Sequence, residues 1–429
     1  MSYLEDEVLF VTDRRFWQRS MGSEQRIASL VRFLCRRGHR VSVAYVGRID
    51  RHQSRILESF VAECPGLELI ARTHPLRNPL AFVAERSRLS WEAARSRLHP
   101  RTRTSAPGAL SQRIAGRAAS PARRTFVERL IATRAPRVVV IEFLRLTGLI
   151  VPRPPLEASR GEGREHRQPV YLVDTIDLLH ERAESFQAQG LALDHAIDAA
   201  EEARALATYD AVIAIQAREA EKLRHLVPST LVLEVPHGLS MPKTPYTPVP
   251  ASEERPLRLG FLGGRDESNV HALDWLVDRV WPRLTEALGR SVELHVAGPI
   301  CSVWKAPPSE GIRLWGQVDS IDEFWPEIDV ALNPVRSGSG LKIKSVEALA
   351  YGRPLLTTRV GAQGLEEASP EGLRIDDTPE GWIETLRAWA VDADLRAAIA
   401  RRGREFARAR FSEEAAFEPL ILYLEKVLG

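Results

Sequence analysis

The densest run of residues that could do chemistry begins at Val335 and ends at Gly364. A predicted strand leads into the turn Ser337-Gly338-Ser339-Gly340, and a helix is predicted over Gly340–Tyr351. Glycines let a backbone approach a ligand closely, and the first amides of a helix point their N–H groups at an anion. The sequence therefore predicts an anion site at this turn. The residues expected to form it are Ser337, Gly338, Ser339, Gly340 and Leu341.

Charged side chains follow this turn. Lys342 lies just after it, and Lys344 and Glu347 are three residues apart, so they share one face of the predicted helix. A lysine can neutralise a diphosphate, and a carboxylate can accept hydrogen bonds from ribose hydroxyls. A nucleoside diphosphate needs both functions at about this separation. The alternative is a solvated Lys–Glu pair on a helix surface, which contributes only ~0.3–0.5 kcal/mol.

A second glycine-rich turn closes another predicted strand. Gly263 and Gly264 end that strand, and Arg265 follows before a helix predicted over Ser268–Val280. An arginine can fork onto phosphate oxygens. Two glycines after a strand are often only a tight turn. Because both turns follow strands of one predicted parallel sheet, they can face the same cleft.

Two residues of the first half are candidates for catalysis. Asp177 and His180 follow a predicted strand, and a spacing of three lets one helical turn pair them. Such a pair could orient an acceptor hydroxyl or share its proton. The alternative is that Asp177 caps the next helix and His180 lies on the surface. Glu142, at the end of the preceding strand, is a further candidate, with a buried ion pair as its alternative.

The elements that position these residues alternate along the chain. Short apolar strands separated by helices predict parallel sheets covered on both faces. The first half has seven predicted strands: Glu7–Asp13, His39–Gly47, Leu67–Arg72, Arg137–Phe143, Pro169–Asp174, Ala211–Gln216 and Thr230–Val235. The second half has five: Leu257–Gly264, Val292–Gly298, Ile312–Trp315, Asp329–Val335 and Pro354–Thr358.

The length and one proline-rich stretch divide the chain. A single core rarely serves more than about 250–300 residues, and the chain has 429. We predict an α/β protein with two Rossmann-like, doubly wound domains that face each other across a cleft. The predicted parts are an N-terminal domain at 1–236, a linker at 237–256, a C-terminal domain at 257–411, and a final helix at 412–429 that packs back on the N-terminal domain.

Composition narrows the class of protein. The hydrophobic fraction is 44% and the charged fraction 27%, which is typical of a globular protein. A formal net charge of +2 predicts no nucleic-acid partner. Cys35, Cys64 and Cys301 are too few and too widely spaced for a disulfide framework or a zinc site, so we expect buried thiols in a reducing compartment.

Targeting signals are not evident. The first ten residues carry acids and lack a long apolar core, so no signal peptide is predicted. The longest apolar stretch, Val138–Val151, is interrupted by charges and is shorter than the ~20 residues that span a bilayer. We expect a cytoplasmic protein without a membrane-spanning helix.

One basic segment, 92–128, interrupts the first domain between its third and fourth strands. It contains no acid between Glu92 and Glu128. Its arginines are Arg95, Arg97, Arg101, Arg103, Arg113, Arg117, Arg123 and Arg124. The segment could hold the protein at the inner face of an anionic membrane, since each nearby basic residue contributes about 1 kcal/mol, or it could bind an anionic acceptor. The alternative is a solvated loop; few aromatic residues are available to stack nucleic-acid bases.

With these motifs in place, the second domain resembles the group 1 nucleotide-sugar glycosyltransferases, which are retaining enzymes of the two-domain GT-B fold. The matching stretches are Gly260–Pro282, Leu294–Pro299, Ile312–Gln317, Asp329–Pro334 and Ser337–Leu365. The most specific is Gly-x-Lys-x-Lys-x-x-Glu-Ala-Leu-Ala-x-Gly-x-Pro from Gly340. The resemblance implies that Glu347 holds the donor ribose, and that Arg265 with Lys342 or Lys344 holds the diphosphate.

The first domain resembles the family more loosely. Gly22 and Ser23 open its first helix, and Asp174 ends its fifth strand; these three are expected on the acceptor side. The family often has a second glutamate eight positions before the ribose-binding one, where it contacts the donor sugar. Here that position is Ser339.

The resemblance implies a glycosyltransferase of the hexosyltransferase type. The expected donor is a UDP- or GDP-sugar, and the expected acceptor is a hydroxyl of a sugar, a lipid-linked molecule or a protein. Transfer is expected to retain the anomeric configuration and to need neither a metal nor a cofactor, in polysaccharide or glycoconjugate synthesis. The alternatives are an inactive binding or scaffold protein on this fold, and a nucleotide-sugar epimerase or hydrolase.

Overall fold

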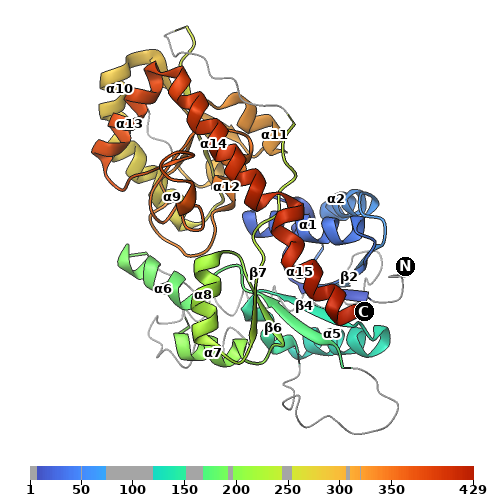
Figure 1. The fold of residues 1–429 in the computed structure, drawn as a ribbon. Coiled ribbons are helices and arrows are strands. Elements are labelled where there is room, and N and C mark those ends of the chain that lie inside the picture. Colours follow the sequence, from blue (N-terminus) through green and yellow to red (C-terminus); the bar gives the residue numbers. More distant parts are fainter. Residues whose placement is uncertain are drawn as a thin grey trace, which may run out of the picture.

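The computed structural model describes residues 7–49, 51–73, 119–150, 168–191, 197–243, 254–305, 310–318 and 320–429. They form two α/β domains, each built on a parallel sheet with helices packed against it (Figure 1). The predicted fold class is confirmed. Within the described part of the chain, no helix is long and apolar enough to cross a membrane.

The N-terminal sheet has seven parallel strands in the order β3-β2-β1-β4-β5-β6-β7. Their bounds are β1 (Glu7–Thr12), β2 (Arg40–Arg48), β3 (Leu67–Thr73), β4 (Val138–Glu142), β5 (Val170–Asp174), β6 (Ala211–Ala214) and β7 (Leu231–Glu234). The order reverses between β1 and β4. Ligands of doubly wound sheets bind at the carboxyl ends of the strands beside such a reversal.

Side chains of β1 alternate between two cores. Val8 and Phe10 pack on one face of the sheet with α1, whereas Leu9 and Val11 pack on the other face with Val127 of α5. All four β1 side chains are fully buried. The continuous apolar run in the sequence therefore reflects a strand that is covered on both sides. The helices of this domain are α1 (Gly22–Arg36), α2 (Arg51–Ala62), α5 (Pro121–Arg134), α6 (Leu179–Ala188), α7 (Ala199–Leu206) and α8 (Ala217–Leu226).

Helix α5 changes the expected extent of the basic segment. The end of the predicted insertion 92–128 is helical: Pro121 is the first residue of α5, a position that suits its fixed φ and missing N–H. Arg123 and Arg124 therefore lie on a helix, and Nε of Arg124 donates to the carbonyl oxygen of Gly148. The other six arginines of the segment lie outside the described residues.

The C-terminal sheet has six parallel strands in the order β10-β9-β8-β11-β12-β13. Their bounds are β8 (Leu257–Leu262), β9 (Val292–Ala297), β10 (Ile312–Gly316), β11 (Val330–Asn333), β12 (Leu355–Thr357) and β13 (Arg374–Ile375). All twelve predicted strands occur. Strand β13 was not predicted, because it is two residues long and has no apolar run to reveal it.

Helix α12 begins later than predicted. The helices that follow β8 along the chain are α9 (Glu267–Trp275), α10 (Trp281–Leu288), α11 (Ile321–Phe324), α12 (Ile343–Ala350), α13 (Pro379–Val391), α14 (Ala393–Phe411) and α15 (Glu413–Leu428). The sequence predicted a helix from Gly340, but Gly338 and Gly340 have φ of 121° and 74°. These left-handed conformations cannot belong to a right-handed helix, so three residues extend the turn.

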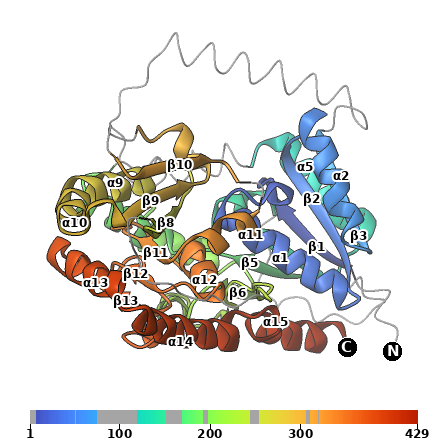
Figure 2. The same cartoon turned by 90° about the horizontal axis from the view of Figure 1, so that it is seen from above.

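The chain ends on the N-terminal domain. Helices α14 and α15 follow each other along one side of the molecule, from the C-terminal to the N-terminal domain (Figure 2). The rings of Phe417 in α15 and Phe33 in α1 lie 5.1 Å apart, and Arg36 pairs with Glu413 at 2.6 Å. The last helix, α15, thus packs on the N-terminal domain and connects it to the C-terminal domain through α14.

Candidate functional site

A cavity of about 320 Å³ lies between the two domains, at the carboxyl ends of both sheets. Most of the predicted site residues line it: Gly22, Ser23, Asp177, Gly263, Gly264, Ser337, Gly338, Ser339, Leu341, Lys342, Lys344 and Glu347. Arg265, His180, Gly340 and Asp174 do not belong to its lining.

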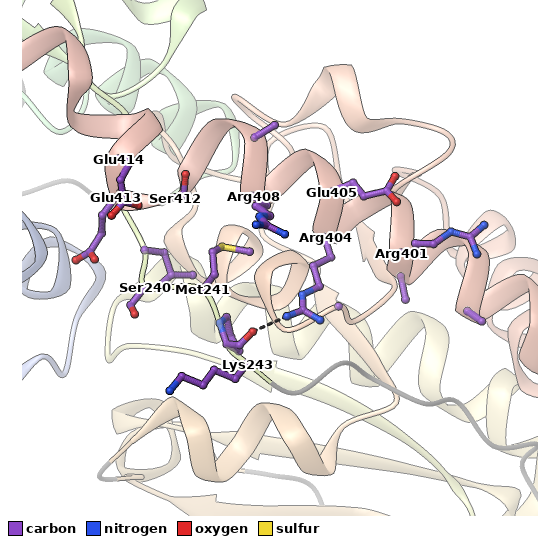
Figure 3. A pocket seen from close by; sticks show the side chains of 16 residues that line it. Ser240, Met241, Lys243, Arg401, Arg404, Glu405, Arg408, Ser412, Glu413 and Glu414 are labelled. Carbon is purple, nitrogen blue, oxygen red and sulfur yellow. Dashed lines mark hydrogen bonds between the residues drawn. The ribbon is translucent and has the colours of Figure 1, made fainter.

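A second cavity, of about 1190 Å³, lies between the interdomain segment Leu239–Lys243 and helix α14 (Figure 3). Arg401, Arg404 and Arg408 of α14 form part of its wall. It is larger, but its wall contains no residue from the carboxyl end of a strand in either sheet. The smaller cavity is the candidate site because ligands of this fold class bind at the strand ends.

Lys344 is held rigidly at the C-terminal wall, the side of the cavity that the C-terminal domain forms. Its Nζ donates to Oδ1 of Asn269 at 2.6 Å and lies 4.2 Å from the centre of the Phe261 ring. Asn269 is held in turn by Asp266, whose carboxylate caps α9. Burial lowers the pKa of Lys344 to about 8. A buried ammonium group facing a cavity is well placed to bind an anion.

Lys342 holds the glycine-rich turn in shape. Its Nζ donates to the carbonyl oxygens of Ser339 and Gly340, at 3.1 and 2.8 Å, and to Oε1 of Gln363 at 3.1 Å. Burial lowers its pKa to about 8 as well. Lys342 therefore has two functions, since it closes the turn and adds a positive charge to the cavity wall.

Glu347 presents an unused acceptor. The side chain is buried, and burial raises its pKa to about 8, although hydrogen bonding from Gln25 of α1 and Trp325 and the charge of Lys344 act in the opposite direction. Its Oε1 has no hydrogen-bond partner among the described residues. Buried polar atoms are normally satisfied, so an unpaired carboxylate oxygen on a cavity wall indicates a position for a ligand hydroxyl.

The glycine-rich turn docks against the N-terminal domain. The Ser339 hydroxyl donates to the carbonyl oxygen of Leu178 at 3.1 Å, and the Gly338 amide donates to the Ser185 hydroxyl at 2.9 Å. A Cβ on Gly340 would lie only 2.7 Å from the carbonyl oxygen of Ile176. Gly340 therefore permits the close contact between the two domains, although it does not line the cavity.

Asp177 and His180 do not form the predicted pair. Asp177 accepts from Nη1 of Arg182 at 2.8 Å and lines the cavity. His180 instead bonds Oε2 of Glu202 through Nδ1 at 2.6 Å, which raises the pKa of the imidazole. Glu202 also accepts the amides of Leu179 and His180, so a residue of α7 caps α6. The prediction of a pair was wrong, and so was its alternative in which Asp177 caps the helix.

Asp174 lies beneath the site and is not part of the cavity wall. The side chain is fully buried and accepts from Nε and Nη2 of Arg26, at 2.7 and 3.1 Å. Glu142 is its neighbour on β4, and neither of its carboxylate oxygens has a hydrogen-bond partner in the described structure. Burial, and then the charge of Asp174, raise the pKa of Glu142 well above its usual value.

Arg265 turns away from the cavity. Its Nε donates to the Ser302 hydroxyl at 2.9 Å, and the side chain is exposed. The glycine turn beside it is nonetheless tightly built, because a Cβ on Gly298 would lie 2.6 Å from the carbonyl oxygen of Gly263.

Several residues that line the cavity were not predicted from the sequence. They are Arg14, Gln25, Phe143, Arg182, Asp266 and Asn269. Phe143 and Ile176 follow adjacent strands and have φ of 75° and 65°. Such conformations cost of order 1–3 kcal/mol for residues other than glycine and concentrate at functional sites. Of these six, Asp266 and Asn269 carried a usable signal, because both lie within the resembling stretch Gly260–Pro282.

The described residues contain no group of three or more His, Cys, Asp or Glu side chains that could hold a metal ion. The positive charges of the cavity wall come from lysine and arginine.

The fold and the site together define a class. Two doubly wound domains enclose a cavity whose wall carries glycine-rich turns, buried lysines and a carboxylate oxygen without a partner in the described structure, and the two-domain fold is that of the GT-B glycosyltransferases. Residues 256–392 match the family model described as "Glycosyl transferases group 1". The C-terminal domain is thus a group 1 glycosyltransferase domain, and the protein is a glycosyltransferase.

Solved structures share the fold over the whole chain. Sucrose-phosphate synthase from Thermosynechococcus elongatus is 14% identical with a TM-score of 0.63, and the alignment covers 98% of this chain and 99% of that one. TarM is 7% identical with a TM-score of 0.65 and full coverage of both chains. HepE from Anabaena, solved with UDP and glucose, is 13% identical with a TM-score of 0.60 and coverage of 98% and 100%. No curated protein sequence matches the chain.

Proposed function

We propose that this glycosyltransferase moves a sugar from a nucleoside-diphosphate-sugar to a hydroxyl of an acceptor bound at the N-terminal wall. The observation that carries the proposal is the unpaired Oε1 of buried Glu347, one helical turn from the buried ammonium group of Lys344. Together they offer an acceptor for ribose hydroxyls and a cation for a diphosphate.

The chemical step needs stabilisation of the leaving group above all. The bond between the anomeric carbon and the diphosphate oxygen breaks, the acceptor oxygen bonds to that carbon, and the hydroxyl proton passes to the departing diphosphate. Both lysines are fixed before reaction: Lys342 donates three hydrogen bonds to neighbouring residues, and Lys344 donates one. Preorganised charges of this kind stabilise developing negative charge without reorganisation.

Acceptor binding is assigned to the N-terminal wall. Gly22, Ser23 and Asp177 line the cavity there, and Asp177 is fixed by Arg182. Asp177 is proposed to orient the acceptor hydroxyl. His180 is assigned a structural role instead, because its ring is bonded to Glu202 and does not line the cavity.

The donor base is proposed to be uracil or guanine, with retention of configuration as the resemblance to group 1 enzymes implies. HepE was solved with UDP and with UDP-glucose, which supports UDP as the first nucleotide to test. The acceptor class proposed is a sugar, lipid-linked or protein hydroxyl, in polysaccharide or glycoconjugate synthesis.

The deciding experiment is calorimetry with UDP and GDP, followed by product analysis with and without acceptor hydroxyls. Nucleotide binding with transfer only in the presence of an acceptor supports the proposal. Free sugar without acceptor would indicate a hydrolase, an epimerised donor an epimerase, and binding without turnover a scaffold protein. Transfer is expected to persist in excess EDTA, because lysines supply the charge; a strict requirement for magnesium or manganese would contradict this part.

Peripheral membrane contact at the cytoplasmic face is proposed through Arg95–Arg124. Co-sedimentation with anionic vesicles is the test, comparing the wild type with a variant in which these arginines are glutamine. Because Arg124 bonds Gly148 in the fold, the variant should keep Arg123 and Arg124 unchanged. Equal, negligible binding of both proteins would remove the proposal.

A further inference from the structure

The cavity wall carries five cationic side chains, and one of them differs from the rest. Lys342 and Lys344 are hydrogen-bonded as described above. Arg182 pairs with Asp177 at 2.8 Å, and Arg19 pairs with Glu63 at 2.9 Å. No carboxylate of the described residues forms an ion pair with Arg14, whose Nε is buried and has no hydrogen-bond partner there.

Arg14 is nonetheless held in place. Its amide donates to the Thr12 hydroxyl at 3.0 Å, and its guanidinium lies 4.9 Å from the centre of the Phe143 ring. Arg145 lies 4.7 Å from the same ring and is paired with Asp13. Stacking on an aromatic face fixes the plane of a guanidinium and leaves its N–H donors at the rim free for hydrogen bonds.

The ring beneath Arg14 is positioned at an energetic cost. Phe143 has a φ of 75°, in the left-handed region, where a residue with a Cβ is strongly disfavoured. Phe143 also lines the cavity. Strain at a cavity wall, together with a stacked and unpaired arginine, indicates a position built for a ligand and not for packing alone.

The location of Arg14 separates it from the donor. It follows β1 of the N-terminal domain, whereas the two lysines proposed for the diphosphate belong to the C-terminal domain. Resting on the proposed function, we propose that Arg14 binds an anionic group of the acceptor, so that the preferred acceptors carry a phosphate or a carboxylate. The planar fork of the guanidinium matches the oxygen atoms of either group.

The test uses inorganic phosphate and acetate as probes, each titrated against chloride at equal ionic strength into the full-length protein saturated with UDP. Phosphate or acetate should bind the wild type, and Arg14→Gln should weaken that binding about ten- to a hundredfold, as expected for the loss of one or two charge-assisted hydrogen bonds. Arg14→Lys should restore part of the affinity. The stronger of the two probes identifies the acceptor's group.

A matched control is Arg37→Gln. Arg37 also stacks on an aromatic ring, with its guanidinium 5.8 Å from the centre of the Phe33 ring, but it does not line the cavity. Its substitution should leave probe binding unchanged. UDP affinity of Arg14→Gln should stay within about twofold of the wild type, because the donor contacts lie on the other wall.

The outcomes separate this inference from the proposed function. Normal UDP binding with no phosphate or acetate binding, or with equal probe binding by the wild type and Arg14→Gln, overturns the role of Arg14 alone. Failure of the wild type to bind UDP or GDP overturns the proposed donor site. The probe titrations are therefore repeated without nucleotide, where loss of affinity in Arg14→Gln still reports on Arg14.

Discussion

The two walls of the cavity are built in different ways. On the C-terminal wall, the charged side chains come from two short stretches, 263–269 and 337–347, which follow β8 and β11. On the N-terminal wall they come from the ends of β1, β4 and β5 and from α1 and α6. The first wall is a pair of local motifs, whereas the second exists only after the sheet has formed.

The walls also obtain their tight turns differently. The C-terminal wall uses glycines with positive φ, such as Gly298 and Gly338, which adopt this conformation at little cost. The N-terminal wall places Phe143 and Ile176 in the left-handed region, where side chains are strained. A nucleotide site common to many proteins can be built from local glycine turns, whose conformational cost is low. The wall proposed to bind the acceptor contains strained residues that the surrounding fold must hold.

The largest effect is expected from Lys344→Ala on the C-terminal wall. Removal of a preorganised charge near a leaving group typically costs 10²–10³ in turnover. Donor kcat/KM should fall by about that factor in a steady-state transfer assay. Lys426→Ala, an exposed lysine of α15, is the control and should be unchanged. A decrease below about threefold would show that Lys344 does not serve the leaving group.

Glu347→Ala should weaken UDP or GDP binding about ten- to a hundredfold in calorimetry, because hydrogen bonds to a charged acceptor contribute ~1.5–3 kcal/mol each. The fold should persist, since one carboxylate oxygen is unpaired in the described structure. Glu384→Ala, an exposed residue of α13, is the control. Unchanged nucleotide affinity would refute the ribose assignment.

The pH dependence of nucleotide affinity is a second test of the assignment of Glu347 to the ribose. Glu347 has a pKa raised to about 8, so ribose binding to the ionised form releases a proton, and affinity should rise from pH 7 to 8. Lys342 and Lys344 have pKa values lowered to about 8, so affinity should fall above pH 8 as they lose protons. Glu347→Gln should remove the rise and keep the fall. A flat profile in the wild type would contradict both assignments.

Gly340→Ala should disrupt the contact between the glycine-rich turn and the N-terminal domain. A Cβ there would lie 2.7 Å from the carbonyl oxygen of Ile176, in addition to the cost of a φ of +74°. Transfer should fall by about tenfold, with a smaller effect on nucleotide affinity, because misplacement of one wall disturbs the reacting geometry. Gly190→Ala is the matched control: its φ is +68°, but nothing lies within 4 Å of the added Cβ. Equal losses of transfer in both variants would show that backbone strain alone accounts for the effect.

The smallest effect on activity is expected from His180→Ala. Turnover should change less than about threefold, since the imidazole does not line the cavity. Stability should fall instead, by about 1–2 kcal/mol, because a hydrogen bond to a charged partner is lost. Glu202 raises the pKa of His180, so the stabilisation is fully present below the ordinary value of about 6.5 and is lost as pH rises through the raised pKa.

Denaturant unfolding at pH 6 and pH 9 should therefore show a larger difference between wild type and His180→Ala at pH 6. His225→Ala, an exposed histidine of α8, serves as the control. A large loss of turnover with unchanged stability would return His180 to a role in acceptor binding.

The sequence by itself determined the parts of this protein that depend on local patterns. Apolar runs identified twelve strands because strands buried on both faces carry mostly apolar side chains. The contiguous spacing from Ser337 to Glu347 indicated the charged turn, since neighbours along a turn and one helix face remain neighbours in the fold. The tertiary structure kept nine of the eleven donor residues at the cavity wall and left out only Arg265 and Gly340.

Only the tertiary structure decided which partner each charged residue of the first domain finds. Asp177 pairs with Arg182, His180 with Glu202 and Asp174 with Arg26. The last two pairs join residues 22 and 148 positions apart, so spacing along the chain gave no indication of them. Arg14 and Phe143 meet for the same reason, because parallel pairing of β1 with β4 brings their strand ends together. Neither pattern nor propensity encodes such contacts; they arise from the order of the strands in the sheet.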